Sequence, residues 1–104
     1  MDRKQVEEIA ARIVEKFHPI RIVLFGSHAR GDQTEDSDLD LFVEMETERR
    51  APERAIEVSS LFGLRRWPLD LVVYTPAEVN RLKNSHGTLL SMIEGEGEVL
   101  YEQP

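Results

Sequence analysis

The sequence predicts a mixed α/β (α+β) fold in which helices flank a small mixed β-sheet. Three observations support this class: an amphipathic helical pattern opens the chain, short apolar runs rich in β-branched residues follow it, and helix-start signals separate the later runs. With 104 residues, the chain has the length of a single domain, spanning residues 1–104, and can bury one modest core.

The first expected element is a helix over Asp2–Phe17. Asp2 and Gln5 have the spacing of a capping box, and Pro19 ends the segment. Apolar residues at helical spacing form one stripe along it, made of Val6, Ile9, Ala10, Ile13, Val14 and Phe17.

Two apolar runs, Ile20–Phe25 and Asp38–Met45, are expected to form neighbouring strands. The link between them is slightly short for a parallel crossover, so we expect an antiparallel pair. Within the link, Ser27–Arg30 has the pattern of one helical turn, capped by Ser27 and closed by Gly31.

The segment Thr47–Trp67 is long enough for a crossover helix, so the strand after it, Pro68–Thr75, should run parallel to the second strand. A further helix should start at Thr75, followed by a last short helix over residues 89–93. An edge strand over Val99–Tyr101 should complete the sheet.

Composition excludes several classes of protein. The net charge of −7 argues against stable binding of nucleic acid by this chain alone. No apolar run approaches the roughly 20 residues of a membrane span, and the charged N-terminal segment is not a secretory signal. The chain has no cysteine, which excludes disulfides and thiolate metal sites, and we expect a cytoplasmic location.

An acidic stretch follows the first strand. Five carboxylates fall within nine residues, without any Lys or Arg among them: Asp32, Glu35, Asp36, Asp38 and Asp40. We expect the first three to be solvated loop residues. Such a density of like charge is tolerated best where a cation binds.

Two carboxylates of this stretch should converge with a third from a later strand. Asp38 and Asp40 share one face of the second strand, with Cα atoms about 6.6 Å apart. Asp70 can join that face from the third strand if the two strands are neighbours. Carboxylate oxygens suit Mg²⁺ or Mn²⁺, and the glycine and helix N-terminus after the first strand suit a phosphate.

These residues resemble a known signature. Gly26 and Ser27, ten intervening residues, then Asp38, Leu39 and Asp40 resemble the nucleotidyltransferase motif of the DNA polymerase β superfamily. Asp70, in the run PLDLVVYT, matches the third carboxylate of that superfamily. The whole chain resembles a minimal nucleotidyltransferase domain, which implies the nucleotidyltransferase fold.

The resemblance also implies chemistry. It implies ATP as the nucleotide and two Mg²⁺ ions, with Mn²⁺ as a possible substitute. Carried over by position, the catalytic and metal-binding residues are Asp38, Asp40 and Asp70. Gly26 and Ser27 would hold the terminal phosphates, with Arg30 one turn beyond, where its cation could reach the same phosphates.

Minimal nucleotidyltransferases of this kind occur in prokaryotes as antitoxins beside a HEPN-domain RNase toxin. The resemblance therefore implies a protein adenylyltransferase that places AMP on a tyrosine hydroxyl of the toxin, within a hetero-oligomer. Two alternatives stay open. One is a non-catalytic module that neutralises the toxin by contact, and the other is an aminoglycoside-type enzyme acting on a small hydroxylated molecule.

Overall fold

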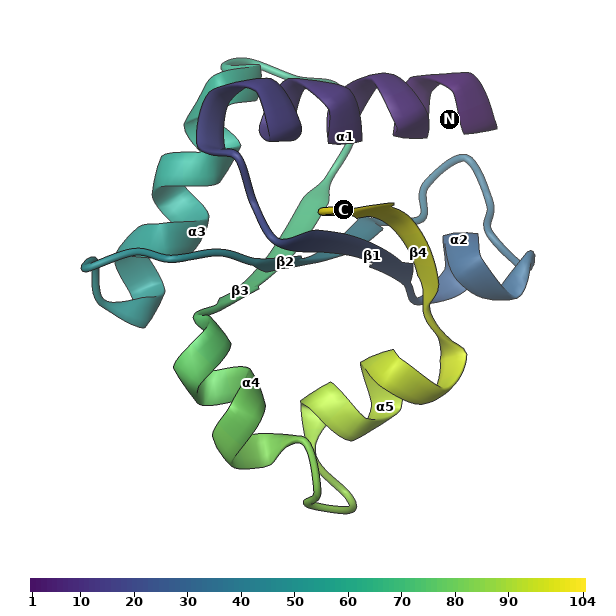
Figure 1. Ribbon diagram of the computed structural model, residues 1–104. Coiled ribbons are helices and arrows are strands. Elements are labelled where there is room, and N and C mark those ends of the chain that lie inside the picture. Colours follow the sequence, from purple (N-terminus) through teal and green to yellow (C-terminus); the bar gives the residue numbers. More distant parts are fainter.

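The computed structural model describes residues 1–104 and contains a four-stranded sheet between two layers of helices (Figure 1). The sheet has the order β3-β2-β1-β4, with β1 antiparallel to both β2 and β4, and β2 parallel to β3. The strands are β1 (Arg21–Phe25), β2 (Leu39–Glu44), β3 (Leu69–Tyr74) and β4 (Glu98–Glu102). The predicted mixed sheet, antiparallel return and parallel crossover are therefore confirmed.

Helices cover both faces of this sheet (Figure 1). Helices α1 (Arg3–Phe17) and α3 (Ala51–Ser59), the latter extended by the 3₁₀ turn η1 (Ser60–Phe62), lie on one face. Helices α4 (Pro76–Leu82) and α5 (Leu89–Glu96) lie on the other. Strand residues divide between the layers by alternation, as β-strand geometry requires. In β2, the first layer receives Leu39, Leu41 and Val43, while the second receives Phe42.

Two predicted helix ends are wrong. The N-cap of α2 (Ser27–Arg30) is Gly26 rather than Ser27, because Gly26 has the non-helical backbone and Ser27 already belongs to the helix. Helix α5 continues beyond residue 93 to Glu96, because the turn closes only where the N–H of Gly97 donates to the carbonyl of Ile93. The capping box at Asp2 is confirmed.

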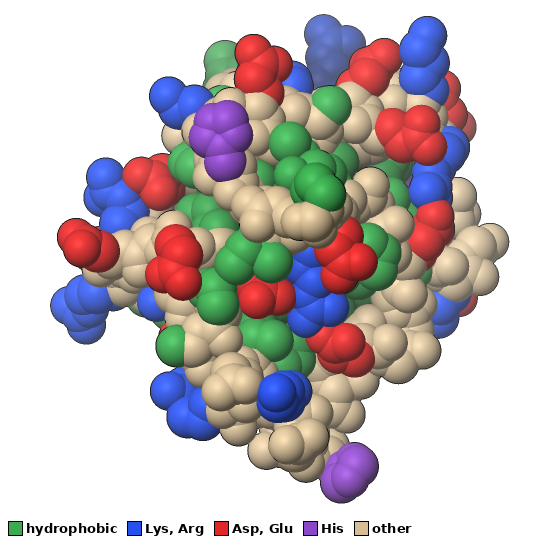
Figure 2. Space-filling model, viewed as in Figure 1, with side chains coloured by type: hydrophobic (Ala, Val, Ile, Leu, Met, Phe, Trp, Pro, Cys, Tyr) green, Lys and Arg blue, Asp and Glu red, His purple; other side chains and the backbone are tan.

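The surface mixes charges of both signs. Figure 2 shows acidic and basic side chains interspersed over the viewed face, without a broad basic area of the kind that grips a phosphate backbone. None of the helices has the length and apolar character needed to span a membrane.

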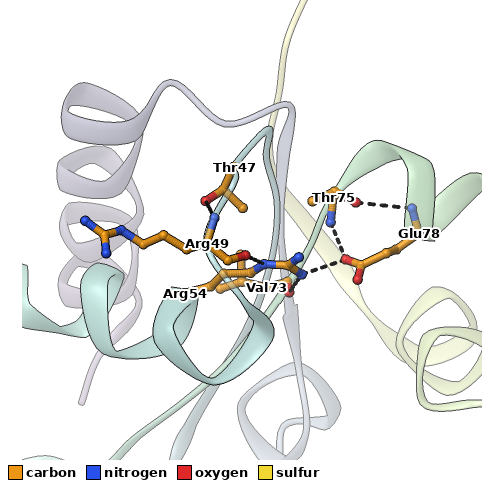
Figure 3. Close-up of polar contacts among 6 residues, drawn as sticks. All are labelled: Thr47, Arg49, Arg54, Val73, Thr75 and Glu78. Atoms are coloured by element: carbon orange, nitrogen blue, oxygen red, sulfur yellow. Dashed lines mark hydrogen bonds and ion pairs between the residues drawn. The ribbon is translucent and has the colours of Figure 1, made fainter.

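The buried Arg54 ties three elements together (Figure 3). From α3, its guanidinium donates to the carbonyl of Arg49 (2.8 Å), to the carbonyl of Val73 in β3 (3.3 Å) and to Oε1 of Glu78 in α4 (2.7 Å). Burial alone would raise the pKa of Glu78, but hydrogen bonds from the Thr75 N–H and from Arg54 hold that pKa below its ordinary value. The cluster therefore fixes the end of β3 against α3 and α4.

We expect Arg54→Ala to lower the free energy of unfolding by about 3 kcal/mol, because it removes the ion-pair partner of a part-buried carboxylate and takes a donor from each of two carbonyls. Urea denaturation measures the change. Arg49→Ala is the control: its ion pair with Glu57 is more exposed, so its loss should cost roughly 0–1 kcal/mol. Equal unfolding midpoints for both variants would contradict a structural role for Arg54.

Candidate active site

The end of β1 and the starts of β2 and β3 lie at the same end of the sheet. The register pairs Phe25 with Asp40, and Asp40 with Asp70. Directly paired residues project from the same face of a sheet, so the two carboxylates lie side by side. That face is the one that α4 and α5 cover further along the strands, where Phe42 packs. Asp38 precedes β2 by one residue, and its charge acts on Asp40.

The pKa of Asp40 is raised to about 6. Partial burial is the largest cause, since it penalises the ionised carboxylate. The charges of Asp70 and Asp38 and a hydrogen bond with Asp70 raise the pKa further, while the charge of Arg30 lowers it slightly. The negative charges of the three aspartates are therefore only partly offset by positively charged side chains.

The chemistry of this donor set fits a hard divalent cation, because all three groups offer carboxylate oxygens. No three His, Cys, Asp or Glu side chains are arranged so that they could hold a metal ion as they stand. A cation bound between the aspartates would relieve the repulsion of their charges. A Mg²⁺ site here would therefore require the side chains of Asp38, Asp40 and Asp70 to turn toward the ion.

Gly26 forms the turn between β1 and α2. Its backbone, with φ 71° and ψ −155°, lies in a region that favours glycine. A Cβ at this position would lie 2.1 Å from Oδ2 of Asp40. Only glycine therefore lets the turn approach the carboxylate so closely.

The other predicted nucleotide-binding residues lie on α2. Ser27 is half-buried at the start of this turn. Arg30 is brought to the same end of the sheet, but its guanidinium is engaged: Nε donates to Asp32 (3.2 Å) and Nη1 to Glu96 (3.4 Å). The Nδ1 atom of His28 lies 3.1 Å from the carbonyl oxygen of Asp38, which connects α2 to the start of β2.

Glu96 is the residue of this region that the sequence analysis missed. Its Oε1 accepts a hydrogen bond from the N–H of Gly26 (3.2 Å) as well as from Arg30. One local signal could have indicated it. A glycine commonly follows the last residue of a helix, and Gly97 would have placed the end of α5 at Glu96.

Comparison with known proteins identifies the class to which this fold and site belong. The family described as "Nucleotidyltransferase domain" matches residues 6–103, so the chain belongs to this family.

One curated relative, from Methanocaldococcus jannaschii, is named as a candidate protein adenylyltransferase, MJ1379. It is 53% identical over 32 residues, which are 31% of this chain and 32% of the relative. The match therefore spans about a third of that protein's length.

Solved structures share the fold. A candidate nucleotidyltransferase from Sulfolobus solfataricus is 23% identical, with a TM-score of 0.64 over 96% of this chain and 79% of that one. A toxin–antitoxin structure with AMP-PNP is 22% identical, with a TM-score of 0.62 over 93% of this chain and 73% of that one. The nucleotidyltransferase fold predicted from the sequence is thereby confirmed.

We expect Gly26→Ala to destabilise the domain more than Gly63→Ala. Both glycines have a positive φ with a strongly negative ψ, so alanine at either site costs roughly 1–3 kcal/mol of backbone strain. At Gly63 the added methyl group meets nothing within 4 Å, whereas at Gly26 it collides with Asp40. Chemical denaturation measures the loss of stability in each variant, and the difference between the two losses gives the cost of the collision. Equal losses would show that the close approach to Asp40 is not needed.

The raised pKa of Asp40 predicts a pH-dependent stability. The pKa in the folded state, about 6, lies above the ordinary value of 3.8, so this group's contribution is fully present below about pH 4 and is lost as the pH rises through about 6. We expect Asp40→Asn to be more stable than the parent at about pH 8, by on the order of 1 kcal/mol after allowing for solvent screening.

The difference between Asp40→Asn and the parent should shrink toward about pH 4, where the parent carboxyl is protonated. Thermal melts across this range, in chelator and without added metal, provide the measurement. Asp36→Asn in the exposed loop is the control, with no comparable trend. A parent that matches Asp40→Asn in stability at about pH 8 would contradict the raised pKa.

Proposed function

We propose that this domain transfers AMP from Mg-ATP to a tyrosine hydroxyl of a partner HEPN RNase toxin and acts as its antitoxin. The observation that carries the proposal is the cross-strand pair of Asp40 and Asp70 beside the Gly26 turn, in a member of the nucleotidyltransferase family. Two comparisons lend support: the relative named as a candidate protein adenylyltransferase, over a short segment, and the toxin–antitoxin structure with AMP-PNP, through its fold.

In this proposal Asp38, Asp40 and Asp70 hold two Mg²⁺ ions. When bound, Mg²⁺ would neutralise phosphate charge and stabilise the entering and leaving oxygens of the displacement. The residues of the chain supply position and electrostatics rather than a covalent nucleophile. The turn at Gly26 and Ser27, together with Arg30, holds the terminal phosphates and leaves the α-phosphate beside the aspartates.

The proposed reaction balances without a further reactant. The tyrosine oxygen forms a bond to the α-phosphorus, the bond from that phosphorus to the oxygen bridging to the β-phosphate breaks, and pyrophosphate leaves. The carboxylate of Asp70 takes up the hydroxyl proton. Asp70 is exposed and lies on β3, an edge strand of the sheet, so a protein segment can approach it from outside. Since the reaction consumes ATP, we place it in the cytoplasm.

The test is incubation of the domain with its partner toxin and ATP labelled at the α-phosphate. We expect label on the toxin, and we expect Asp38→Asn/Asp40→Asn to reduce the labelling rate by on the order of 100-fold or more, because the transition-state charge loses its stabilisation. Glu35→Gln/Asp36→Asn, which removes two exposed carboxylates from the same acidic stretch, should label at the parent rate.

The outcomes separate the candidate functions. Absence of label on the toxin, or undiminished labelling by the double aspartate variant, would overturn the proposal. If the folded double variant still inhibits the toxin at equal concentration, the domain acts by contact alone. Transfer to small hydroxylated acceptors but not to the toxin would favour the aminoglycoside-type activity.

A further inference from the structure

Glu96 lies where a bound phosphate would be expected. The donors that the proposed function assigns to the terminal phosphates include the backbone N–H of Gly26 and the guanidinium of Arg30. One oxygen of Glu96, Oε1, accepts from both, at 3.2 Å and 3.4 Å. The carboxylate of Glu96 therefore occupies the place at this turn that the proposed function assigns to a phosphate.

We propose that Glu96 is a specificity-determining residue of the nucleotide site. Its carboxylate competes with the ligand, and a ligand that carries a terminal phosphate chain displaces it whereas a nucleoside monophosphate does not. This inference rests on the proposed function. It adds that the site selects for the terminal phosphates of the nucleotide.

The fold holds Glu96 in this place. Glu96 is the last residue of α5, and Gly97 closes the helix by donating its N–H to the carbonyl of Ile93 (2.8 Å). A Cβ on Gly97 would lie 2.4 Å from Cγ1 of Val23, so the end of α5 packs tightly against β1. The side chain of Glu96 is only 28% exposed. Its position is therefore set by packing at the end of β1 and not by a free loop.

Competition follows from the number of donors. A backbone N–H has one proton, so a phosphate oxygen that accepts it must replace Oε1 of Glu96. The guanidinium of Arg30 has several N–H donors, but the N–H on Nε already donates to Asp32. A terminal phosphate brings more negative charge than a carboxylate and can offer several acceptor oxygens, which favours the exchange. AMP places its only phosphate beside the aspartates and gains nothing at this turn.

The experiment is titration calorimetry with Mg-AMP-PNP and, separately, with Mg-AMP. We expect Glu96→Gln to bind Mg-AMP-PNP about 10-fold more tightly than the parent, because a neutral amide competes less well for Arg30 and the Gly26 N–H than a carboxylate does. Its affinity for Mg-AMP should be unchanged. Glu96→Asp keeps the charge but shortens the reach, and should show a smaller gain.

Glu94→Gln is the matched control. Glu94 belongs to the same helix and its removal changes the net charge equally, but it pairs with Arg21 and not with the turn. Its affinity for Mg-AMP-PNP should stay within about 2-fold of the parent, since exposed charges away from the turn are screened.

Equal affinity of Glu96→Gln and the parent for Mg-AMP-PNP would overturn the inference and leave the proposed AMP transfer intact. An equal gain in Glu94→Gln, or an equal gain for Mg-AMP, would also overturn it. Absence of nucleotide binding in the parent and in every variant would instead overturn the proposed function, and the inference with it.

Discussion

The register between the parallel strands β2 and β3 is the constraint on which the candidate site depends. It sets Asp40 directly beside Asp70. Side chains alternate along a strand, so a slip of one residue would turn Asp70 to the opposite face of the sheet. The same slip would remove Leu69 and Leu71 from the layer they share with α1 and α3. Apolar packing on one face therefore fixes the geometry of the carboxylates on the other.

This register places negatively charged side chains close together. The apolar packing of the same strands stabilises the register against their repulsion. Partial burial, followed by the charges of Asp70 and Asp38, raises the pKa of Asp40, and only the charge of Arg30 acts in the opposite direction. At the far end of β3 the situation is reversed, since Arg54 and Glu78 form a compensated, hydrogen-bonded pair. One end of the strand is thus anchored by matched charges, while the other retains unmatched charges that suit a cation.

Local patterns in the sequence predicted the strands, their directions and the shared face of Asp40 and Asp70, because alternation and loop length depend on neighbouring residues. They did not reveal the contact between Gly26 and Glu96, which are seventy positions apart in the chain. They also assigned the cap of α2 to Ser27, because serine is the commoner cap and a positive φ at Gly26 leaves no local pattern. The role of Arg54 as a buried link was equally hidden, since its partners belong to three separate segments.

The turn at Gly26, where Glu96 binds, and the three neighbouring aspartates require charges of opposite sign. A half-buried N–H at Gly26 without an acceptor would cost stability, and Glu96 supplies that acceptor from within the chain. The aspartates need positive charge, while the turn needs negative charge. A magnesium–triphosphate complex carries both in one ligand, with cations for Asp38, Asp40 and Asp70 and phosphate oxygens for the turn. A free metal ion, or Mg-AMP with its only phosphate beside the aspartates, would supply positive charge to the aspartates but nothing to the turn, which is why the proposed selection concerns the whole complex.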